Sequence, residues 1–109
     1  MIPPSQAFEI EQARARLAAG TGGYEIVHRS AGLEIGVYVL VAPEPDRQQP
    51  HDDDEVYVVL EGTGVLTVEG HPTLVGPGQA IFVPAHAEHQ FTAYEGLSVL
   101  VIFAKTSDQ

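Results

Sequence analysis

The chain has 109 residues, a length that suits one domain and is too short for two separate hydrophobic cores. Five Lys and Arg stand against fifteen Asp and Glu, so the net charge of −10 repels phosphate backbones and anionic membrane surfaces, and nucleic acid is not an expected partner. The absence of cysteine excludes disulfides and thiolate metal sites.

The N-terminal segment MIPPSQAFEIEQ has no basic stretch followed by an apolar core, which a secretory signal would need. The longest apolar run, residues 37–43, is far shorter than a membrane span. We therefore expect a soluble, cytoplasmic protein with no membrane partner.

Residues 9–19 are rich in Ala, Glu, Gln and Arg, and they predict one short amphipathic helix. Ile10, Ala13 and Leu17 fall at helical spacing, and Gly20 follows as a stop signal. The expected organisation is a single domain over 1–109, with a helical or extended arm over 1–22 and a β-barrel over 23–105.

The rest of the chain is dominated by β-branched and aromatic stretches, separated about every eight to twelve residues by Gly, Pro and acidic residues. These stretches are 24–30, 33–42, 55–62, 64–70, 79–84, 89–94 and 97–104. Tight-turn signals over 61–64, 69–72 and 76–78 favour antiparallel pairing. The pattern is typical of a sandwich or small barrel, and the jelly roll is the natural candidate.

Alternation along the stretch that starts at Glu55 assigns its two faces. Glu55 and Tyr57 share one side, whereas Val56 and Val58 point the other way. Both faces are apolar, so the outer one is expected to be covered by another sheet or another subunit. Residues 97–104 show the same pattern, and we expect a homodimer formed through β surfaces.

Two imidazoles and one carboxylate, from His51, Glu55 and His89, form the ligand set that a first-row transition metal with open positions needs. A straight strand would hold residues four apart about 13 Å from each other. The intervening residues 52–54 are three aspartates, which are poor strand formers, so His51 is expected to end one strand and Glu55 to start the next. Two imidazoles favour Fe, Mn, Ni, Cu or Zn over calcium, and the aspartates are interpreted as a solvated connection.

The segment PHDDDEVYVVLEGTGVLTV resembles the first signature motif of the cupin superfamily, in particular that of small single-domain cupins of the conserved-barrel, cupin 2 type. His51 falls on the second histidine of that motif, Glu55 on its glutamate and Gly62 on its closing glycine. Gln49 occupies the position of the missing first histidine. The resemblance leaves a triad of ligands or a fourth ligand from Gln48 or Gln49.

The segment VGPGQAIFVPAHAEHQF resembles the second motif of the same family. Gly78, Pro84 and His89 fall on family positions, His86 replaces a turn glycine, and Ala93 replaces an asparagine. The resemblance covers about positions 48 to 91. It implies an all-β fold, a double-stranded β-helix or jelly-roll barrel, here with one short N-terminal helix.

The resemblance implies one divalent transition metal (Fe, Mn, Ni, Cu or Zn) and dioxygenase, isomerase, lyase or decarboxylase chemistry on a small organic molecule inside the barrel. The expected metal ligands are His51, Glu55, His89 and Gln49. The expected substrate pocket is lined by Tyr57, Phe82, Phe91 and His86, although ordinary core packing is the expected role of at least one of these aromatics. A noncatalytic module that binds a small ligand is the alternative, ahead of a structural dimer without metal. His28 and His71 are interpreted as structural and solvated residues.

Overall fold

The computed structural model describes residues 2–105, which form one helix followed by six strands. The elements are α1 (Ile10–Ala19), β1 (Gly22–Arg29), β2 (Leu33–Leu40), β3 (Asp54–Val68), β4 (His71–Val75), β5 (Ala80–Val83) and β6 (His89–Ala104). The predicted helix is confirmed, and each predicted β stretch lies in a strand. No helix among the described residues is long and apolar enough to span a membrane.

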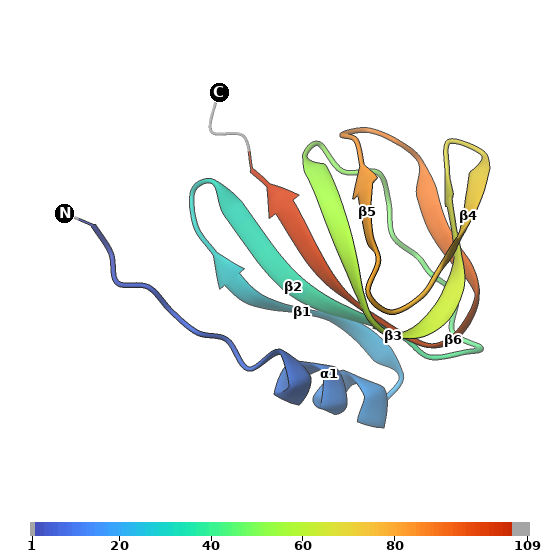
Figure 1. The fold of residues 1–109 in the computed structure, drawn as a ribbon, viewed down its shortest axis with the longest axis horizontal. Helices are drawn as coiled ribbons and strands as arrows, with labels where there is room; N and C mark the ends of the chain where they lie inside the picture. Colours follow the sequence, from blue (N-terminus) through green and yellow to red (C-terminus); the bar gives the residue numbers. More distant parts are fainter. Residues whose placement is uncertain (1, 106–109) are drawn as a thin grey trace.

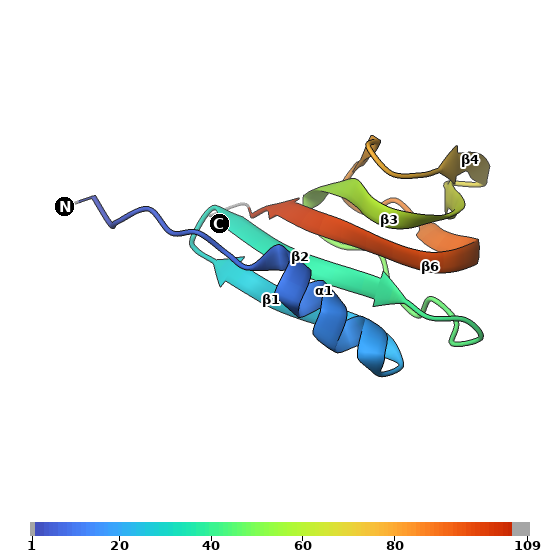
Figure 2. The same cartoon turned by 60° about the horizontal axis from the view of Figure 1, so that its bottom comes forward.

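All strand pairs are antiparallel, in the order β1-β2-β6-β3-β4, with β5 pairing on β3. The C-terminal half of β6 pairs with β2 and with the start of β3, and its N-terminal half curves away with the end of β3, which pairs with β4 (Figure 1). The curvature of these two long strands folds the sheet into two facing layers, as the turned view shows (Figure 2). A space between the layers is therefore enclosed by strands that are distant in sequence.

The predicted turn over 61–64 is wrong, because β3 runs through it without interruption. The pairing of β3 with β6 shifts register repeatedly between Val59 and Val65. Gly62 has a φ of +81°, and a Cβ there would lie 2.2 Å from the Gly96 carbonyl oxygen. The two glycines therefore mark a bend where backbones approach closely, and the same bend makes 89–104 one strand instead of the predicted two.

The other predicted turns are confirmed. Glu69 and Gly70 join β3 to β4 as a two-residue loop, with φ of +48° and +80°, which is typical of tight hairpins. Residues 76–79 connect β4 to β5. A long loop over 41–53 connects β2 to β3.

The predicted alternation of β3 is also confirmed. Glu55, Tyr57 and Val59 are buried on the inner face, whereas Val56 and Val58 are half-buried on the outer face. The inner core contains the large buried side chains Tyr57, Leu66, Phe91, Leu97, Val99 and Phe103.

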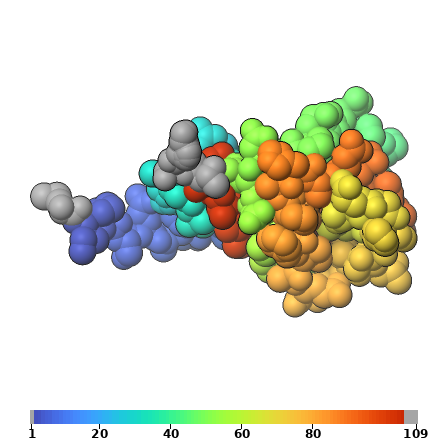
Figure 3. Space-filling model, turned by 90° about the horizontal axis from the view of Figure 1, so that it is seen from above, coloured from blue at the N-terminus to red at the C-terminus, as the bar shows by residue number. Residues whose placement is uncertain are grey.

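The helix covers the outer face of β2. Ala13 is fully buried against Val37 and Val39, and Ile10 and Leu17 pack beside it. On β2, therefore, the apolar outer face is covered by α1 of the same chain, and not by a second sheet or subunit. The residues before α1 extend away from the strands (Figure 3).

Candidate metal centre

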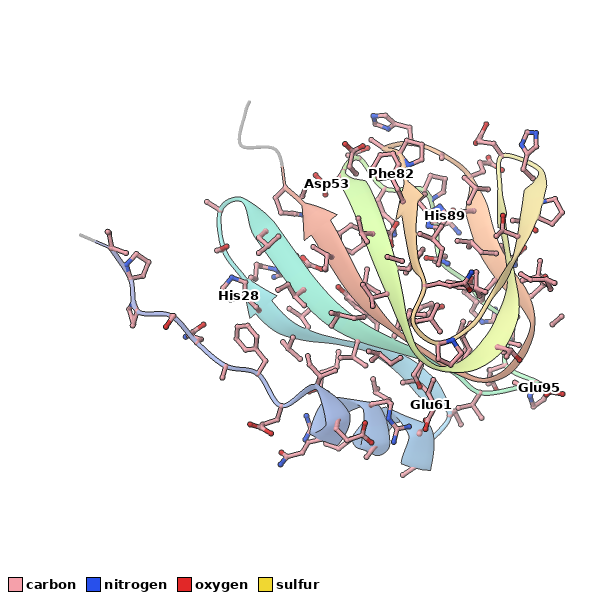
Figure 4. All side chains as sticks on the ribbon, viewed as in Figure 1. His28, Asp53, Glu61, Phe82, His89 and Glu95 are labelled. Carbon is pink, nitrogen blue, oxygen red and sulfur yellow. The ribbon has the colours of Figure 1, made fainter. Side chains whose placement is uncertain are left out.

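The fold brings together the three residues that the sequence singled out. His51, Glu55 and His89 each offer a ligand atom, and these atoms lie within 4.8 Å of one another. His51 lies in the loop before β3, Glu55 near the start of β3, and His89 at the start of β6. The curvature of the two long strands brings these segments to the same interior space, at the end of the molecule away from α1, where Figure 4 shows His89.

His51 does not end a strand, as the sequence suggested, but lies in the loop over 41–53. Its ring is half-buried, with its centroid 4.7 Å from that of Phe103 in a T-shaped contact. Its backbone carbonyl accepts a 2.7 Å hydrogen bond from the His86 N–H. A hydrogen bond between two loops, and not strand pairing, therefore positions His51.

The backbone carbonyl of Ala87 sets the tautomer of His89. Its Nδ1 lies 2.9 Å from the Ala87 carbonyl oxygen, which can only accept, so Nδ1 carries the proton. Nε2 is then the ring nitrogen that can bind a metal, and it lies 3.3 Å from Glu55 Oε1. This orientation is the one that a metal-binding histidine with a carbonyl partner adopts.

Two polar atoms at this site are buried without a partner among the described residues: Glu55 Oε1 and His89 Nε2. Both side chains are almost fully buried, and the 3.3 Å contact lacks hydrogen-bond geometry. Burial by itself would lower the pKa of His89, but the neighbouring Glu55 carboxylate and the hydrogen bond to the Ala87 carbonyl outweigh burial and raise the pKa above its ordinary value. An unpaired buried carboxylate is costly, so either a proton on His89 or a cation between the two atoms is needed.

A divalent transition metal fits this donor set. Two imidazoles with one carboxylate match the facial triad that leaves coordination positions open on one side. His51 and Glu55 line a cavity of about 310 Å³. The other lining residues are Tyr24, Glu34, Tyr38, Gln48, Asp53, Val101, Phe103 and Lys105.

One wall of the cavity is formed by a tyrosine held in place by a glycine and a carboxylate. The Tyr24 ring crosses Gly36 so closely that a Cβ on Gly36 would lie 2.3 Å from it. The Tyr24 hydroxyl donates to buried Glu34 at 2.9 Å, and the Arg29 guanidinium donates to the same carboxylate at 3.2 Å. Burial and the bond to Glu34 raise the pKa of Tyr24, so the phenol stays protonated.

At the rim of the cavity, Lys105 Nζ lies 3.1 Å from the Asp53 carboxylate. The predicted solvated connection over 52–54 is partly correct. Asp52 is exposed, whereas Asp53 pairs with Lys105, and Asp54 accepts from the Ala85 N–H at 2.9 Å. These contacts tie the loop that carries His51 to both neighbouring segments.

The residues that line the 310 Å³ cavity do not include the four predicted to line a substrate pocket. Phe82 is 59% exposed on the outer face of β5, because alternation on that short strand turns it away from the interior. Phe91 and Tyr57 pack against each other within the buried core. His86 is exposed at the rim, with Nδ1 3.5 Å from the Asp52 carboxylate.

The two glutamines differ in their surroundings. Gln48 is half-buried and lines the cavity, but its Oε1 accepts from the Tyr57 hydroxyl at 2.6 Å and its Nε2 donates to Asp46 at 2.6 Å. Gln49 is exposed and lines, together with His89, a second cavity of about 540 Å³.

Sequence reasoning missed the cavity wall contributed by β1 and β2. One signal was present: in LEIGVYVL, Glu34, Gly36 and Tyr38 alternate on one face of an otherwise apolar strand. A charged residue on the inner face and a glycine within a strand both indicate a close approach or a site. The contribution of β1 could not be read in this way, because it depends on how far the Tyr24 side chain reaches across β2.

Comparisons with known proteins agree with this geometry. The model of the Cupin domain family matches residues 37–103. An uncharacterized protein of Streptomyces coelicolor is 38% identical over 100 residues, which cover 91% of this chain and 95% of that protein. An RmlC-like cupin from Shewanella frigidimarina has a TM-score of 0.65 at 18% identity, covering 78% of this chain and 77% of that chain. The expected all-β jelly-roll barrel with one short helix is confirmed.

Two relatives are enzymes. Dimethylsulfoniopropionate lyase DddW of Ruegeria pomeroyi is 39% identical over 62 residues, which cover 56% of this chain and 41% of the lyase. An acireductone dioxygenase of Bacillus pumilus is 33% identical over 61 residues, which cover 51% of this chain and 35% of the dioxygenase. The chain therefore matches less than half the length of either enzyme.

Proposed function

The chain belongs to the cupin family, and we propose that it is a metal-dependent enzyme of dioxygenase, isomerase or lyase type that acts on a small organic molecule inside the barrel. The observation that carries this proposal is the pair of buried, unpartnered atoms, Glu55 Oε1 and His89 Nε2, beside His51. One divalent ion of Fe, Mn, Ni, Cu or Zn, bound by these three residues, would satisfy both atoms. Gln49, which lines the same cavity as His89, is the candidate for a fourth ligand.

The remaining residues bind and orient the substrate. A bound ion of this kind supplies Lewis-acid or redox chemistry at its open positions. Val101 and Phe103 form the apolar side of the cavity, which limits water around the site. The Tyr24 hydroxyl has its proton committed to Glu34, so its oxygen is available to accept a hydrogen bond from a substrate.

The relatives support two reaction types as the first to test, since one is a lyase and the other a dioxygenase. The protein should be reconstituted separately with each of the five metals and offered dimethylsulfoniopropionate or acireductone, with product formation and oxygen uptake measured. We expect turnover with at least one metal and a loss of at least about 100-fold in a Glu55→Ala variant. Binding of these compounds to metal-loaded protein without turnover would favour the noncatalytic module.

We also propose that the protein is a cytoplasmic homodimer that uses the outer face of β3, β5 and β6. Val56 lies in register with Phe82 on one side and Ile102 on the other, which forms an apolar row ending in a largely exposed ring. Solitary exposed aromatics are normal, but a contiguous apolar row is typical of an interface.

Replacing Phe82 with lysine is expected to convert a dimer into a monomer, because a charge would be placed within the apolar contact. Light scattering coupled to size-exclusion chromatography measures the mass directly. A matched Leu74→Lys change on β4, at another exposed apolar position, should leave the mass unchanged. Equal masses for the wild type and the Phe82 variant would contradict this interface.

A further inference from the structure

Asp46 is a buried carboxylate in the loop between β2 and β3, only 4% exposed although it lies among turn-forming residues. The Tyr38 hydroxyl donates to its Oδ1 at 2.6 Å, and the Gln48 backbone N–H donates to the same atom at 3.2 Å. The Gln48 side-chain amide donates to Oδ2 at 2.6 Å, and the Phe91 N–H donates to Oδ2 at 2.7 Å. Four donors thus fill the roughly four acceptor positions that a carboxylate has.

Two of the three donor residues, Gln48 and Phe91, lie in segments that carry proposed metal ligands, and Tyr38 lies on β2. Asp46 is in the same loop as His51, and Phe91 follows His89 by two residues in β6. The third link is indirect. The Tyr57 hydroxyl donates a hydrogen bond to Gln48 Oε1 at 2.6 Å. Tyr57 lies two residues after Glu55 on the same face of β3.

Asparagine could not take the place of this carboxylate. It has a single carbonyl oxygen and an amide group that donates, so in either orientation one backbone N–H, that of Gln48 or that of Phe91, would face another donor. A buried donor left without an acceptor is costly, and the loop would move to relieve it. Preservation of the loop conformation, and of the spacing between the three ligand segments, therefore depends on a negative charge at this position.

We propose that Asp46 is a positioning residue that holds His51, Glu55 and His89 at metal-binding spacing before the ion arrives. This inference rests on the proposed metal site and assigns a role to a residue outside it. Residues that orient metal ligands without touching the metal affect affinity by about 10–100-fold when they are changed.

The test compares Asp46→Asn with Glu44→Gln, which removes the same charge from an exposed carboxylate two residues earlier in the same loop. Affinity for Co²⁺ is measured by competition with a chromophoric chelator, the Co²⁺ absorption spectrum reports the coordination geometry, and thermal unfolding of the metal-free proteins reports the fold. We expect Asp46→Asn to weaken Co²⁺ binding about 10–100-fold and to alter the spectrum, with Glu44→Gln matching the wild type.

A purely structural role would lower the unfolding temperature but leave affinity and spectrum unchanged, and that result would overturn the inference. If Asp46→Asn does not fold, Tyr38→Phe removes one of the four donors more gently. It should then weaken Co²⁺ binding by up to about tenfold, and wild-type affinity in that variant would count against the inference. Failure of the wild type itself to bind Co²⁺ would instead remove the proposed metal site, and this inference with it.

Discussion

Replacing Glu55 with alanine is expected to weaken transition-metal binding by at least about 100-fold, more than a change to any residue that only orients the ligands. Glu55 supplies the one negative charge among the three clustered ligands and is 2% exposed. Competition titrations with Zn²⁺ or Co²⁺ measure the loss. Thermal unfolding gives a second readout, because an ion present at 100 times its Kd stabilises the wild type by about 2.7 kcal/mol, and this gain should vanish in the variant.

The matched control is Glu61→Gln, which removes a carboxylate from the same strand. Glu61 is exposed, pairs with Arg14 at 2.8 Å and lies near α1, at the opposite end of the barrel from His89 (Figure 4). The Glu61→Gln variant should bind metal as tightly as the wild type. Retention of affinity within tenfold in Glu55→Ala would show that this carboxylate is not a ligand.

Gly62→Ala is expected to cause the largest loss of stability, about 2–6 kcal/mol of the free energy of unfolding. The positive φ of Gly62 costs about 1–3 kcal/mol for a residue with a side chain. The added Cβ would also lie 2.2 Å from a backbone oxygen of Gly96, and relieving such overpacking costs a further 1–3 kcal/mol or so. Urea denaturation measures the change through the midpoint at constant slope.

Gly70→Ala separates these two contributions. Gly70 has a φ of +80°, but a Cβ there would meet nothing within 4 Å. It should therefore lose only the conformational part, about 1–2 kcal/mol. Equal losses in the two variants would mean that β3 and β6 do not approach as closely at the bend as the structure shows.

The same bend explains which parts of the fold the sequence could predict. The helix, the inner face of β3 and the two-residue hairpin follow from local periodicity and turn chemistry, and all three were predicted. The local sequence does not distinguish a glycine at a bend within a strand from a glycine in a turn. The pattern around Gly62 and Gly64 was therefore interpreted as a hairpin. Only the partner strand, with Gly96 opposite, distinguishes a bend from a turn.

The candidate site shows a similar division. His51, Glu55 and His89 were singled out by residue type and spacing, and the structure brings their ligand atoms together. The cavity beside them was predicted poorly, because Phe82 was selected by its apolar character. Its orientation depends on which face of β5 pairs inward. The wall built from Tyr24 depends on contacts across strands, for which a single sequence carries little signal.

We propose that His51, Glu55 and His89 bind one transition-metal ion. The most direct test of this site is the metal content of untagged protein. Inductively coupled plasma mass spectrometry should be carried out on the wild type and on a His89→Ala variant, both as purified and after reconstitution with Fe, Mn, Ni, Cu and Zn. We predict close to one ion per chain in the wild type and a large loss in the variant. Absence of metal from both proteins after reconstitution would contradict the metal site and leave the noncatalytic ligand-binding module as the better account.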